Sequence, residues 1–68
     1  MENFAKRLRE LRKEQNISQR KLAQIFGLSH TAYGDYERNI NQPSLETLIV
    51  IAEYFGVTTD YLLGREEY

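Results

Sequence analysis

The stretch SQRKLAQIFGLSHTAYGDYER, residues 18–38, predicts two short helices joined by a tight turn, and the other helices are expected to pack around them. Ser18 and Ser29 are typical N-caps, since a serine hydroxyl accepts a hydrogen bond from an unpaired amide of the first helical turn. Gly27 lies where a left-handed residue would end the first helix. Helices that meet at so short a turn cross steeply, and Ala23 is small enough to let them approach closely.

This pair of helices has the geometry of a helix-turn-helix unit, whose second helix can be presented to a DNA major groove. The formal net charge of −1 does not favour a strongly electrostatic DNA binder, but the charges are unevenly distributed. Residues 1–42 hold eight Lys and Arg against five Asp and Glu, whereas residues 43–68 hold one against five. Positive charge is therefore concentrated in the half that contains the unit, which permits DNA binding without requiring it.

Length and composition exclude several other classes of protein. A chain of 68 residues is expected to form one small domain. The absence of cysteine excludes disulfides and thiolate zinc sites, and a single histidine gives no metal cluster. Neither a membrane-spanning run nor a signal-peptide pattern is present, so a cytoplasmic protein is expected. No nucleophile–base pair or phosphate-binding glycine loop suggests an enzyme, a cofactor or a small-molecule ligand.

Three further helices are expected around the helix-turn-helix unit, which gives a compact all-α fold of five helices. The first spans residues 3–15, and residues 39–43 form a loop after the unit. Ser44 and Thr58 are N-caps of the fourth and fifth helices, and residues 65–68 are expected to form a frayed acidic tail. The buried face of the fourth helix is predicted to comprise Leu45, Leu48, Ile49, Ala52 and Phe55.

An ordered set of residues between Phe4 and Gly64 carries a family resemblance. It comprises Leu11-Arg12, Ser18-Gln19, Leu22-Ala23, Gly27, Ser29, Tyr36-Glu37-Arg38, Pro43-Ser44-Leu45, Ala52, Phe55-Gly56-Val57 and Asp60-Tyr61-Leu62-Leu63-Gly64. On these residues the chain resembles the phage-repressor and Cro type of helix-turn-helix domain, the XRE family. The resemblance implies a five-helix repressor-type fold that binds operator DNA, usually as a dimer on a two-fold symmetric site.

The outward face of the second helix of the unit is the candidate base-reading surface. A step of 100° per residue places Thr31, Gly34, Asp35 and Arg38 outward. By the resemblance, His30, Thr31 and Asp35 match the family's base-reading positions, with Gly34 between them. Thr31 can contact a thymine methyl, and Asp35 can accept a hydrogen bond from cytosine N4. The alternative interpretation of the same residues is a solvated outer helix face.

Two segments that flank this helix are expected to contact DNA phosphates, which give affinity and register. One is the N-terminus of the helix that follows Ser18, where the resemblance implies that Gln19 either touches the backbone or buttresses the reading helix. The other is the segment after the reading helix. The predicted phosphate contacts are Ser18, Gln19, Arg38, Asn39, Asn41 and Gln42.

The resemblance also implies two structural features. Arg12 and Glu37 match a partly buried ion pair that locks the first helix to the reading helix. Tyr33 departs from the branched aliphatic residue usual at its position, so its hydroxyl needs a partner or a path to solvent. A homodimer, at least on DNA, is expected to form through the region between the fourth and fifth helices. The residues predicted for that contact are Val57, Thr58, Thr59 and Tyr61.

The sequence therefore predicts a sequence-specific double-stranded DNA-binding transcriptional regulator, and in the first place a repressor that binds a two-fold symmetric operator through the major groove. The alternative is a protein-interaction module, similar to an antitoxin or anti-repressor, that kept the fold and binds DNA weakly or not at all. The near-zero net charge, Gly34, Asp35 and Ile40 support the alternative. The capped helix at Ser18 and the flanking Arg38 favour DNA binding.

Overall fold

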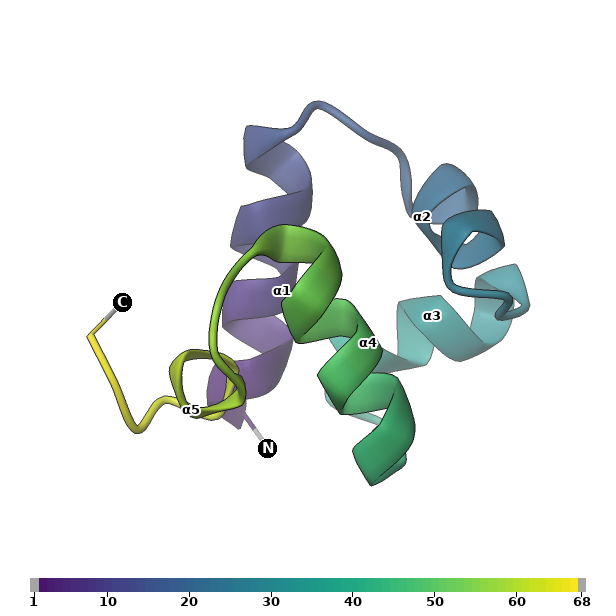
Figure 1. The fold of residues 1–68 in the computed structure, drawn as a ribbon. Helices are drawn as coiled ribbons and strands as arrows, with labels where there is room; N and C mark the ends of the chain where they lie inside the picture. The colour runs from purple at the N-terminus through teal and green to yellow at the C-terminus, as the bar shows by residue number, and fades with distance from the viewer. Residues whose placement is uncertain (1, 68) are drawn as a thin grey trace.

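The computed structural model describes residues 2–67, and within them the chain is all-helical, as the sequence predicts (Figure 1). Short connections join the helices, and α5 lies beside α1. The helices are α1 (Glu2–Glu14), α2 (Gln19–Ile25), α3 (His30–Glu37), α4 (Leu45–Phe55) and α5 (Thr59–Leu62).

Each helix after α1 begins at the cap that the sequence predicts. The hydroxyls of Ser18, Ser29, Ser44 and Thr58 accept hydrogen bonds, 2.9–3.1 Å long, from the amides three residues later. Asn16 adopts a left-handed conformation, with φ of 55°, two residues after the end of α1. Local signals of this kind set the helix boundaries because each involves only neighbouring residues.

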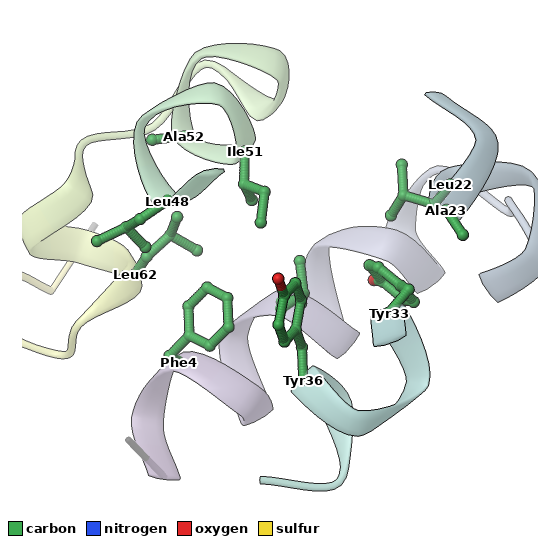
Figure 2. Close-up of a cluster of buried hydrophobic side chains, with 10 residues drawn as sticks. Phe4, Leu22, Ala23, Tyr33, Tyr36, Leu48, Ile51, Ala52 and Leu62 are labelled. Carbon is green, nitrogen blue, oxygen red and sulfur yellow. The ribbon is translucent and has the colours of Figure 1, made fainter. Parts of the chain in front are cut away.

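The core lies where all five helices face one another (Figure 2). Tyr33 and Tyr36 of α3 point into it, and the rings of Phe4 and Tyr36 meet edge to face with centroids 6.1 Å apart. Ala23 is buried where α2 approaches α3, as expected of the small residue at this crossing. The buried cluster comprises Phe4, Leu8, Leu22, Ala23, Tyr33, Tyr36, Leu48, Ile51, Ala52 and Leu62.

The rotation of α4 differs from the sequence prediction. Leu45 is 73% exposed and Ile49 is 42% exposed, whereas Ile51 is fully buried. Leu48, Ile51, Ala52 and Phe55 follow the i, i+3, i+4, i+7 pattern of one helix face, and that face meets the core. Leu45 stands at the first position of α4, at the end of the helix, and Ile49 is turned about 100° from Leu48 around it, so neither joins the core.

The segment after α5 also differs from the prediction of a frayed tail. The amide of Arg65 donates to the carbonyl of Asp60 at 2.8 Å. Glu66 is held at two atoms: its carbonyl accepts from Nη1 of Arg7, and its carboxylate accepts from Oγ1 of Thr58, each at 2.5 Å. These bonds tie the tail to α1 and to the cap of α5. Tyr68, the last residue of the predicted tail, lies outside the described residues.

Candidate nucleic-acid interface

The N-terminal end of α3 is the exposed part of the predicted reading helix. His30 and Thr31 are both exposed and follow directly on the Ser29 cap. The opposite face of α3 is buried, with Tyr33 and Tyr36 in the core. The sequence therefore placed His30 and Thr31 correctly on an accessible surface.

Glu37 is the buried carboxylate that fixes α3 to the two preceding helices. Although only 4% of the residue is exposed, its carboxylate accepts four hydrogen bonds. Arg12 of α1 donates from Nε at 2.7 Å to Oε2 and from Nη2 at 3.1 Å to Oε1. Gln19 of α2 donates from Nε2 to Oε1 at 2.9 Å, and the Tyr33 hydroxyl donates to Oε2 at 2.5 Å. The expected Arg12–Glu37 ion pair is present, and Tyr33 has the partner that its hydroxyl requires.

The same contacts set the protonation of this network. Burial by itself would raise the pKa of Glu37, but the hydrogen bonds from Arg12, Tyr33 and Gln19 outweigh it and lower that pKa. The hydrogen bond to Glu37 raises the pKa of the Arg12 guanidinium above its ordinary value. Burial, and then the hydrogen bond to Glu37, raise the pKa of the Tyr33 hydroxyl. The network is therefore a carboxylate held ionised by neutral and cationic donors.

The predicted phosphate contacts at the start of α2 are both engaged within the protein. Ser18 uses its hydroxyl to cap α2, and the side-chain amide of Gln19 is bound to Glu37. Of the two roles that the resemblance implied for Gln19, the buttressing one is the contact seen in this structure. Ser18 remains on the surface, beside the exposed Arg20 and Lys21.

The middle of α3 differs from the helical-wheel prediction. Gly34 lies on the outward face but is buried, because the Arg38 side chain lies across it. A Cβ at position 34 would lie 2.9 Å from Nη1 of Arg38. Asp35 accepts from Nη2 of Arg38 at 2.7 Å and from Nδ2 of Asn41 at 3.2 Å. This cluster was not predicted from the sequence, although the i, i+3 spacing of Asp35 and Arg38 is the signal of such a pair.

The loop after α3 presents the remaining predicted phosphate contacts. Asn39 has a left-handed φ of 61°, and its amide donates to the carbonyl of Tyr36 at 3.2 Å. Asn39, Asn41 and Gln42 are exposed, as is Ile40 between them. A hollow of about 640 Å³ adjoins this loop and α1, and it brings Lys6 and Arg9 to the same side as Arg38.

Most of the predicted dimer residues lie around a second hollow, of about 370 Å³. Val57, Thr58 and Tyr61 line it, together with Leu11, Glu14 and Gly56. Thr59 is partly buried nearby in the first turn of α5 and does not line the hollow.

Features of two other kinds of protein are absent from residues 2–67. None of the helices described there is long and apolar enough to cross a membrane. No three His, Cys, Asp or Glu side chains in that range are grouped in a way that could hold a metal ion.

A helix with an exposed N-terminal end, α3, follows α2 after a tight turn, and this arrangement defines a helix-turn-helix domain of the repressor type. A helix-turn-helix family model matches residues 8–62. The chain therefore belongs to the helix-turn-helix family, in its XRE type. The family resemblance drawn from the sequence is confirmed.

Individual relatives are similar over almost the whole chain. The HTH-type transcriptional regulator AnsR of Bacillus subtilis is 44% identical over 61 residues, which cover 90% of this chain and 53% of AnsR. The cryptic phage CTXphi transcriptional repressor RstR of Vibrio cholerae is 31% identical over 94% of this chain and 58% of RstR. The chain spans about half the length of the curated relatives it matches.

The fold is also that of a solved repressor. The structure of the P22 c2 repressor protein in complex with synthetic operator 9T matches with a TM-score of 0.84 and 30% sequence identity. The match covers 93% of this chain and 96% of the repressor chain. The predicted five-helix repressor-like fold is confirmed by this similarity.

Proposed function

We propose that this chain is a sequence-specific DNA-binding transcriptional regulator that represses by occupying a two-fold symmetric operator as a homodimer. One observation carries the proposal: the N-terminal face of α3 is exposed, while Glu37 fixes the same helix to α1 and α2. A rigidly held helix with an accessible N-terminal face suits insertion into a major groove, where base edges are read.

The relatives support this function. The solved structure that the chain resembles is a repressor with operator DNA, and the similar proteins AnsR and RstR are named as a transcriptional regulator and a repressor. Since the chain matches about half of such relatives, regulation by the whole protein is part of the proposal. Action on chromosomal or phage DNA in the bacterial cytoplasm follows from the same proposal.

The residues divide into three proposed roles. His30 and Thr31 read base edges from the exposed end of α3, while Val57 and Tyr61 belong to the dimer contact beside the second hollow. Phosphates lie against both ends of the helix-turn-helix unit, where backbone contacts fix the register of the reading helix. The residues proposed for phosphate contact are Ser18, Gln19, Asn39, Asn41 and Gln42.

Selection from a random duplex library with the purified chain tests the proposal. We expect enrichment of an inverted repeat with half-sites about one helical turn apart. Affinity for the selected duplex is expected to fall steeply with salt, because neutralised phosphates release counterions. His30→Ala and Thr31→Ala should each lose about 1–3 kcal/mol of binding free energy, at distinct base positions. Glu53→Ala, at an exposed position of α4, is the matched control.

Two outcomes would contradict the regulator function. One is the absence of any enriched motif together with weak, sequence-blind binding at low salt. The other is an equal effect of His30→Ala and Glu53→Ala on selected DNA. The protein-interaction alternative would then be favoured, and the exposed Leu45, Ile49 and Val50 of α4 would be the first surface to examine.

A further inference from the structure

The Arg38 side chain occupies the outer surface of α3 in place of a side chain at position 34. Arg38 caps the C-terminal end of α3, yet its guanidinium lies back over Gly34, one helical turn earlier. Thr31, Gly34, Asp35 and Arg38 share one face of the helix, at i, i+3, i+4 and i+7. The cation therefore lies on the same face as the exposed Thr31, rather than beyond the end of the helix.

The Asp35 carboxylate is engaged within the protein. Its Oδ1 accepts from Arg38 at 2.7 Å and its Oδ2 from Asn41 at 3.2 Å, and the side chain is only 18% exposed. Both oxygens thus face donors of this chain. The pairing also compensates a negative charge that DNA phosphates would otherwise repel.

The Arg38 guanidinium has donors left over after this pairing. A guanidinium carries five N–H groups in a fixed fork, and one bond to Asp35 uses one of its nitrogens. The Arg38 side chain is 53% exposed, so about half of its surface can be reached from outside the protein. An arginine whose fork is held by a carboxylate loses less rotational freedom when it forms two parallel bonds to a ligand.

We infer that Arg38 reads a base, because its guanidinium, which lies over the middle of α3, can donate to O6 and N7 of guanine. Asp35 is then a positioning residue that holds this guanidinium. This inference rests on the proposed function and replaces the direct contact between Asp35 and cytosine that the sequence suggested. Bidentate arginine is the commonest specific contact to guanine, and the major groove is where those two acceptors lie together. Asn41 holds the second carboxylate oxygen and so restrains Asp35 from the loop side.

Gly34 is the residue that permits this arrangement. Any Cβ at this position would approach Nη1 of Arg38 to 2.9 Å and Nη2 to 3.1 Å, so the guanidinium would have to move. Because the guanidinium is the end of a flexible side chain, the helix itself would tolerate the change. Alanine is also the better helix former, which separates the effect on DNA from the effect on folding.

The test compares base preference in three variants, each selected on a library randomised at one half-site. Arg38→Ala, Asp35→Ala and Gly34→Ala should all lose preference for guanine at the same base pair. The expected loss is about 5- to 150-fold for Arg38→Ala, with smaller losses for the other two. Thermal unfolding should show Gly34→Ala to be at least as stable as the wild type. Asp60→Ala, which breaks the exposed Asp60–Arg65 pair, is the matched control and should keep the preference.

The outcomes separate this inference from the proposed function. If the wild type selects no motif, the proposed function fails. If the wild type selects a motif and Arg38→Ala lowers affinity equally for every sequence, Arg38 contacts phosphate and the inference is overturned. If Asp35→Ala changes preference at a base pair that Arg38→Ala and Gly34→Ala leave unchanged, Asp35 reads DNA directly and the inference is again overturned. If the double variant Asp35→Ala/Arg38→Ala loses more preference for guanine at that base pair than Arg38→Ala alone, the inference is also contradicted.

Discussion

Nε of Arg12 lies 2.7 Å from Oε2 of Glu37, and this contact joins the first helix of the fold to the helix proposed to read DNA. The Arg12 side chain is 13% exposed and the Glu37 side chain 2% exposed, so the pair is largely removed from solvent. Gln19 and Tyr33 bind the same carboxylate. The orientation of α3 therefore depends on one anion that three helices share.

Arg12→Ala should destabilise the protein strongly, because it leaves Glu37 as a buried charge without its cation. The expected loss is about 3–5 kcal/mol in the free energy of unfolding. Urea unfolding followed by circular dichroism measures it. Arg65→Ala, which breaks an exposed pair with 3.7 Å between Nε of Arg65 and Oδ1 of Asp60, should cost less than about 1 kcal/mol. Equal losses in the two variants would contradict a structural role for the Arg12–Glu37 pair.

The pKa of Glu37 predicts an acid-dependent part of stability. Its pKa is lowered by folding, so the unfolded chain binds the proton more tightly. The contribution of Glu37 is therefore complete above its ordinary pKa of 4.5 and is lost as the pH falls through the lowered value of the folded state. Urea midpoints of the wild type and Glu37→Gln should converge on acidification. A gap that stays constant with pH would contradict the shift.

Tyr33→Phe removes one donor to Glu37 and keeps the shape of the buried ring. A hydrogen bond to a charged group contributes about 1.5–3 kcal/mol, so a loss of stability in that range is expected. With this donor gone, the pKa of Glu37 should rise toward its ordinary value. Carbon-13 NMR of labelled glutamate carboxyls in both proteins measures that rise. Tyr54→Phe is the control, since its hydroxyl bonds only to the exposed Gln15 within the described residues.

The rotation of α4 can be tested with two apolar residues on different faces. Ile51→Ala should cost about 2–5 kcal/mol, because it opens a cavity in the core. Leu45→Ala should change the free energy of unfolding by less than about 0.5 kcal/mol, since Leu45 is mostly exposed. Urea unfolding distinguishes these values. A larger loss for Leu45→Ala than for Ile51→Ala would support the face predicted from the sequence instead.

Thr59→Glu tests the proposed dimer contact. A carboxylate in the first turn of α5 interacts favourably with the helix dipole, so folding should be maintained. Across a two-fold axis, however, the two new charges would repel each other. We expect weaker, non-cooperative binding to a full operator and unchanged binding to an isolated half-site. Thr47→Glu, the same change in the first turn of α4, should leave cooperativity intact. Equal cooperativity in both variants would place the dimer contact elsewhere.

Much of this fold was predictable from the sequence because its signals are local. Ser18, Ser29, Ser44 and Thr58 each satisfy an amide three residues away, so the start of each helix depends on a few neighbouring residues. Similarly, the exposure of His30 and Thr31 follows from their place after a cap. The Arg12–Glu37 pair spans 25 residues and came from the family resemblance rather than from local pattern.

Local sequence signals were enough to define which residues form helices, where the helices begin, and which helix presents an accessible N-terminal end. The rotation of each helix and the contacts of its side chains follow instead from the packing of the helices. Periodicity allowed either Ile49 or Ile51 on the buried face of α4, and packing against the other helices selected Ile51. A helical wheel likewise places Gly34 outward, yet Arg38 covers it, because Asp35 binds the guanidinium and Asn41 in turn holds the Asp35 carboxylate. Such contacts depend on side-chain directions in three dimensions, which residue spacing does not specify.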